Sequence, residues 1–67
     1  MKAQPMTFNR DMLPLLGVSW YRFSSLAEAK RFAAYAERES KHWEYPCEAG
    51  ITYDDEARVY EVKVSNW

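Results

Sequence analysis

The feature that most constrains the fold is a helix signal in residues 24–43, SSLAEAKRFAAYAERESKHW. Ser25 followed by Glu28 matches a capping box, in which the serine hydroxyl accepts a hydrogen bond from the Glu28 N–H and the Glu28 carboxylate reaches back to the Ser25 N–H. Alanine is frequent in this segment and β-branched residues are rare, which favours a helix. The sequence therefore predicts one capped helix that begins at this serine.

The helical period divides this segment into an apolar face and a basic face. At about 100° per residue, one face of roughly 120° contains only Ser40 as a polar residue and otherwise collects Leu26, Ala29, Phe32, Ala33, Ala36 and Trp43. We expect this face to be buried with Phe32 as its main anchor, and we expect Pro46 to end the helix near His42 or Trp43. The neighbouring face carries Lys30, Arg31, Arg38, Lys41 and His42, with Glu37 at its edge. Such a face is either simply solvated or a docking face for phosphates or an acidic protein.

The composition is typical of one small folded domain. The 67 residues are 48% hydrophobic, so we expect a single domain over 1–67, with an irregular apolar segment at 1–17 and a strand–helix–hairpin core at 18–67. The single Cys47 excludes an intramolecular disulfide, and the sequence contains neither a signal-peptide pattern nor a membrane-spanning apolar run. We therefore expect a cytoplasmic protein that does not associate with a membrane.

Three segments have the residue pattern of β-strands, namely residues 18–23, 48–53 and 58–64. The polar link at 54–57 joins the last two and predicts a hairpin. The predicted fold class is therefore α+β, with the order strand–helix–strand–strand, one three-stranded and mostly antiparallel sheet, and the amphipathic helix packed on one face. The sequence leaves open whether the first strand lies beside the second or the third.

The sheet face opposite the helix needs a cover of its own. The residues that could lie there are Val59 with either Val18 and Trp20 or Tyr21 and Phe23. Soluble proteins rarely expose an apolar patch of this kind. We expect residues 1–17 to cover it, which predicts a monomer, and a homodimer is the alternative.

The sequence contains no motif for catalysis, for a metal ion or for a nucleotide. It has one histidine, one cysteine and two glycines, too few for a glycine-rich phosphate loop. The run Asp54-Asp55-Glu56 lacks the ligand spacing of a calcium loop, so it is either a solvated turn or an acidic contact point for a basic partner. We therefore expect no enzymatic activity, no cofactor and no metal site.

Charge and aromatic content favour a protein partner. The net charge is −1, with seven Lys/Arg and five Asp/Glu in residues 1–47 against two and five in residues 48–67. This weak charge separation does not suit general DNA affinity, which usually needs a strongly basic domain. Aromatic residues make up 16% of the chain, and exposed Trp, Tyr and Arg anchor protein interfaces. The expected partner-binding residues are Lys30, Arg31, Arg38, Lys41, Tyr21, Trp43, Asp54, Asp55 and Glu56.

In size and architecture the chain resembles the small inhibitor proteins that phages and mobile elements encode, especially anti-CRISPR proteins. The resemblance covers about residues 18–64 and involves no diagnostic motif. It implies a protein of the host cytoplasm that binds a host nucleoprotein complex and blocks its nucleic-acid channel or its recruitment of a nuclease. The basic helix differs from the DNA-mimicking members, which have carboxylates there. We expect a non-enzymatic protein-binding module of this type; the alternatives are a small nucleic-acid-binding protein that uses the basic helix face and an accessory subunit of an enzyme.

Overall fold

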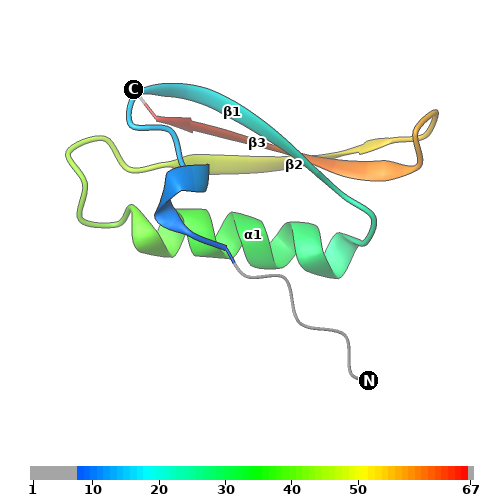
Figure 1. Cartoon of the computed structure of the whole chain (residues 1–67), viewed down its shortest axis with the longest axis horizontal. Helices are drawn as coiled ribbons and strands as arrows, with labels where there is room; N and C mark the ends of the chain where they lie inside the picture. The colour runs from blue at the N-terminus through cyan, green and yellow to red at the C-terminus, as the bar shows by residue number, and fades with distance from the viewer. Residues whose placement is uncertain (1–7, 67) are drawn as a thin grey trace.

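The computed structural model describes residues 8–66, which form a three-stranded sheet with one helix on one of its faces (Figure 1). Along the chain the elements are the 3-10 turn η1 (Arg10–Met12), β1 (Gly17–Phe23), α1 (Leu26–Glu39), β2 (Glu48–Asp54) and β3 (Val59–Asn66). Both strand pairs are antiparallel and the spatial order is β1-β3-β2, so β3 is central. The predicted α+β fold is confirmed, and the first strand lies beside the third. No helix in residues 8–66 is long and apolar enough to cross a membrane.

The helix begins as the capping box predicts. The Glu28 N–H donates to Ser25 Oγ at 3.2 Å, and the Ser25 hydroxyl donates to Glu28 Oε1 at 3.3 Å. The carboxylate thus bonds the serine hydroxyl, where the pattern predicts the serine N–H. Both side chains still close the first turn, and the Glu28 charge lies at the positive end of the helix.

The helix ends earlier than predicted, at Glu39 and not near His42 or Trp43. The reason is the side chain of Ser40, which is fully buried: its hydroxyl donates to the Ala36 carbonyl and accepts from the Cys47 N–H, both at 2.7 Å. This serine satisfies a carbonyl of the last turn and fixes the start of β2 beside the helix end. The chain between them forms turns.

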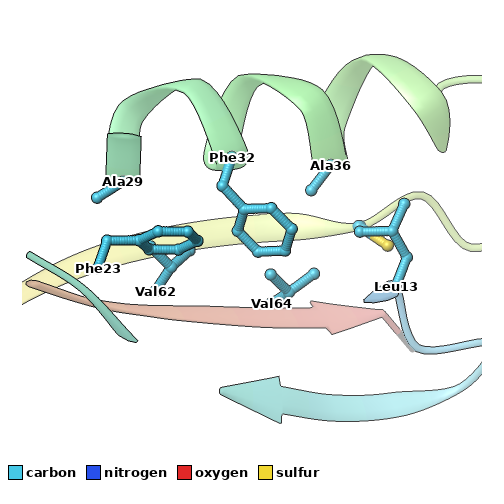
Figure 2. Packing of buried hydrophobic residues seen from close by; sticks show 8 residues of the cluster. Leu13, Phe23, Ala29, Phe32, Ala36, Val62 and Val64 are labelled. Atoms are coloured by element: carbon cyan, nitrogen blue, oxygen red, sulfur yellow. The ribbon is translucent and has the colours of Figure 1, made fainter. Parts of the chain in front are cut away.

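The core lies between α1 and the sheet. Figure 2 shows Ala29, Phe32 and Ala36 pointing from the helix toward side chains of β1 and β3. Phe32 has no exposed surface, which confirms it as the helix anchor, and its ring centroid lies 5.4 Å from that of Phe23. Leu26, expected in the buried face, is instead 40% exposed. Leu26 is the first residue of α1 and lies at the border of its buried face, which centres on Ala29, Phe32 and Ala36.

Residues 8–13 lie on the helix side of the sheet, so the prediction that they cover the opposite face is wrong; residues 1–7, the rest of the predicted cover, lie outside the described residues. The helix packs mainly over β2 and β3 and leaves the inner side of β1 less covered. The Phe8 ring fills this space, with centroid distances of 5.1 Å to Phe32 and 6.1 Å to Phe23, and Leu13 is buried in the same core. The Asn9 side chain caps η1 by accepting from the Asp11 N–H at 3.0 Å.

The opposite face of the sheet is open and mostly polar. Its apolar members are Val18, Trp20 and Val59, which is the first of the two sets that the sequence allowed. Charged neighbours accompany them: Arg22 Nε lies 3.3 Å from Glu61 Oε2, and Lys63 Nζ lies 5.4 Å from the centroid of the Trp20 ring. Charged side chains thus lie beside the exposed Trp20, at the place where the N-terminal segment was expected. The expectation of a monomer stays a prediction.

Candidate interaction surface

Four cations form an exposed basic surface on the side of α1 that faces away from the sheet. It consists of Lys30, Arg31, Arg38 and Lys41, all exposed. The first three project outward because the helical period places them opposite the buried Ala29 and Phe32. Lys41 follows the helix in the turn after Glu39, because the helix is shorter than predicted. The four residues are called the basic surface below.

Two of the three carboxylates of α1 have other partners, and the third, Glu37, is exposed beside Arg38 and forms no ion pair among residues 8–66. Glu28 bonds the helix cap, and Glu39 Oε1 lies 3.7 Å from Arg10 Nε. Among residues 8–66 the only other ion pair joins Arg22 and Glu61 on the open sheet face. The Arg38 guanidinium lies 5.9 Å from the centroid of the Tyr35 ring, a contact that orients its side chain without neutralising it. In this part of the chain, the basic surface therefore keeps its positive charge available to a partner.

The two aromatic residues predicted to contact a partner are only partly exposed. Tyr21 lies on the helix side of β1, where its hydroxyl donates to the Met12 carbonyl at 2.7 Å and its ring centroid lies 5.0 Å from that of Phe32. Tyr21 thus holds residues 8–13 on the core, and its role as a contact residue stays a prediction. Trp43 is partly buried against the core, in the loop between α1 and β2, and one side of it lines a hollow.

The acidic turn divides into one structural and two exposed carboxylates. Asp54 Oδ1 accepts from the N–H groups of Glu56 and Ala57, at 3.1 and 3.2 Å. It therefore builds the turn, together with Arg58, whose φ of 57° reverses the chain. Asp55 and Glu56 are exposed at the tip of the hairpin, which lies at the end of the sheet away from the loop between α1 and β2 (Figure 1), and the contact roles of all three acids stay predictions.

Two residues with important bonds were not selected from the sequence. Asn66 is 2% exposed; its carbonyl oxygen accepts from the Gly17 N–H, and its nitrogen donates to the carbonyls of Pro14, Leu15 and Tyr45. The only sequence signal for Ser40 was its position as the one polar residue on the apolar face. Asn66 had no comparable signal, because its partners come from distant parts of the chain.

Neither a scan against protein-family models nor searches of curated proteins and of solved structures found a match for this chain. Among residues 8–66, no group of three or more His, Cys, Asp and Glu side chains is arranged to hold a metal ion. Cys47 is buried, and its backbone N–H donates a hydrogen bond to the Ser40 hydroxyl. The candidate site therefore rests on the exposed side chains and their charges.

Proposed function

We propose that this protein is a non-enzymatic protein-binding module that engages an acidic patch of its partner through the basic surface. The observation that carries the proposal is the exposure of Lys30, Arg31 and Arg38 on one side of α1 and of Lys41 in the turn that follows it, with no carboxylate in ion-pair distance among residues 8–66. Because α1 is anchored by its cap and by Phe32, the helix backbone that carries three of these cations does not have to reorganise on binding. Complementary charge then steers the encounter.

A protein partner fits the total charge better than a nucleic acid does. The net charge of −1 and the sequence pI of about 5.7 oppose general attraction to a phosphate backbone. An acidic protein patch needs only local complementarity, which the basic surface offers. Asp55 and Glu56, at the hairpin tip, offer a second contact to a basic part of the same partner.

The resemblance to small phage inhibitors suggests where to look for that partner. By this proposal the partner is a host nucleoprotein defence complex, and the chain blocks it by occupying a surface that the complex needs. The size and the strand–helix–strand–strand order support this partner class, and no individual residue does.

A lysate pull-down with matched variants tests the proposal. One variant combines Lys30→Glu with Arg31→Glu; Arg38 is kept because it lies in the last helical turn, where a positive charge stabilises the helix. The control combines Arg58→Glu with Lys63→Glu, which changes the net charge equally away from α1. Because Arg58 lies in the β2–β3 turn and Lys63 lies over the Trp20 ring, melting curves check that the control is folded. We expect the control to capture the same proteins as the wild type and the helix variant to lose at least one of them. Identical captured proteins for all three chains would contradict the proposal.

The basic surface also supports one alternative, a small nucleic-acid-binding protein. It predicts affinity for single- or double-stranded oligonucleotides that falls steeply as salt is raised and that the Lys30→Glu, Arg31→Glu variant loses. Fluorescence anisotropy with labelled oligonucleotides measures this. An accessory subunit of an enzyme would instead capture that enzyme in the pull-down and change its turnover.

A further inference from the structure

A second surface lies at the end of the molecule where two loops meet. One loop precedes β1 at residues 13–16, and the other joins α1 to β2 at residues 40–47. Figure 1 shows both beside the C-terminal end of β3. This end is away from the β2–β3 turn, and among the cations of the basic surface only Lys41 lies in one of its loops.

Large apolar side chains are exposed on this end. Leu15 is 85% exposed, Leu16 65% and Tyr45 49%. They account for half of the six large hydrophobic residues that are exposed among residues 8–66. An apolar surface concentrated in this way typically marks a binding site.

The exposed side chains are held in place by buried hydrogen bonds. Asn66 Nδ2 donates to the Leu15 carbonyl at 3.1 Å and to the Tyr45 carbonyl at 3.2 Å, so one buried side chain fixes both loops. The bond from Cys47 N–H to Ser40 Oγ closes the second loop at its base. Because the backbone of both loops is already fixed, a partner does not have to order these loops when it binds.

Tyr45 lines two neighbouring hollows, and the charged residues that line them are both glutamates. The first, of about 380 Å³, is lined by Leu15, Trp43, Glu44 and Tyr45. The second, of about 370 Å³, is lined by Glu44, Tyr45, Pro46, Glu48, Ser65 and Asn66. The first can receive a large apolar side chain, and the two glutamates favour a cation beside it.

We propose that this end surface, formed by Leu15, Trp43, Glu44, Tyr45 and Glu48, binds a segment of a partner protein that carries a large apolar side chain next to a lysine or arginine. The apolar side chain enters between Leu15 and Trp43, and the cation faces Glu44 and Glu48. This inference goes beyond the proposed function and is independent of it, because it concerns a different surface and a partner segment of opposite charge.

A displayed library of random ten-residue peptides tests the proposal. Peptides selected on the wild-type chain are expected to be enriched in Leu, Phe or Trp adjacent to Lys or Arg. Selected peptides are then synthesised, and their affinities are measured by fluorescence anisotropy. Failure to enrich any such peptide, or enrichment of acidic ones, would overturn the proposal.

Matched variants locate the binding. The variant Leu15→Ser, Tyr45→Ser should weaken the selected peptides at least about tenfold, as the loss of anchor side chains does. The control Leu26→Ser, Tyr53→Ser removes the same residue types at exposed positions elsewhere and should leave the affinity unchanged. Equal loss in both variants, or in neither, would contradict the location. Melting curves by circular dichroism confirm that each variant is folded.

Charge variants test the second half of the recognition. Glu44→Gln with Glu48→Gln should weaken the peptides several-fold and reduce the salt dependence of binding, whereas Asp55→Asn with Glu56→Gln should not. The Lys30→Glu, Arg31→Glu variant should bind the peptides as the wild type does, which separates this surface from the basic surface. Sedimentation provides the last control: a dimer that the Leu15→Ser, Tyr45→Ser variant abolishes would make a second copy the occupant and overturn the proposal.

Discussion

Replacing Asn66 with alanine should destabilise the whole domain although it removes no apolar contact from the core. The Asn66 oxygen accepts from the Gly17 N–H at 3.1 Å. Its nitrogen donates to the carbonyls of Pro14, Leu15 and Tyr45 at 2.8, 3.1 and 3.2 Å. One side chain thus connects the end of β3 to the start of β1 and to the loop after the helix.

The magnitude follows from these bonds. The amide nitrogen has two hydrogens for three carbonyls, so one hydrogen is shared between two of them. With the bond that the oxygen accepts, the side chain therefore contributes the equivalent of about three full hydrogen bonds. At about 0.5–1.5 kcal/mol for each bond, and with partial access of water to the abandoned carbonyls, the expected loss is about 2–4 kcal/mol. A domain of this size has only about 3–5 kcal/mol of net stability, so the variant should be largely unfolded at moderate temperature.

Urea unfolding followed by circular dichroism measures this loss. Asn66→Asp keeps an acceptor for the Gly17 N–H but removes the donors and sets a carboxylate against three carbonyls, so it should be at least as unstable as Asn66→Ala. Thr52→Ala, at an exposed position on β2, is the control and should stay within about 0.5 kcal/mol of the wild type. If Asn66→Ala changed the free energy of unfolding by less than about 0.5 kcal/mol, the structural role of this side chain would be refuted.

Three further substitutions test the core, the cap and the turn by the same unfolding measurement. Phe32→Ala should cost about 3–5 kcal/mol because the side chain has no exposed surface, and a melting temperature within a few degrees of the wild type would disprove its role as anchor. Ser25→Ala should cost about 1 kcal/mol through the lost cap, and an unchanged stability would show that the capping bond contributes nothing. Asp54→Ala should cost about 1 kcal/mol because it removes two turn bonds, while Asp55→Ala should stay within about 0.5 kcal/mol; equal effects would contradict the division of the acidic turn.

The parts of the fold that could be predicted are those with local causes. Ser25 and Glu28 lie in one helical turn, so the start of α1 can be read from adjacent residues. The helical period likewise identified Phe32 as buried. The end of α1 could not be read in this way, because it depends on Ser40 meeting Cys47 across a loop.

The N-terminal segment shows the limit of pattern reasoning. Its apolar residues follow no period, and their position depends on the space that α1 leaves over β1. Tyr21 could be assigned to neither face from the sequence, because β1 has large apolar residues on both sides. The exposure of Lys30, Arg31 and Arg38 followed directly from the period, whereas the end surface depends on Asn66 joining two loops that are distant in the chain.

The most direct test of the central claim uses the partner protein that the pull-down captures. After this partner is purified, its affinity is measured for the wild type and for two variants. Isothermal titration calorimetry compares the wild type, the Lys30→Glu, Arg31→Glu variant and the Arg58→Glu, Lys63→Glu control at low and at physiological salt. Binding through the basic surface predicts an affinity at least about tenfold weaker for the helix variant, a smaller salt dependence for it, and wild-type affinity for the control. Equal affinities for the helix variant and the wild type would contradict the claim that the cations of α1 form the interface.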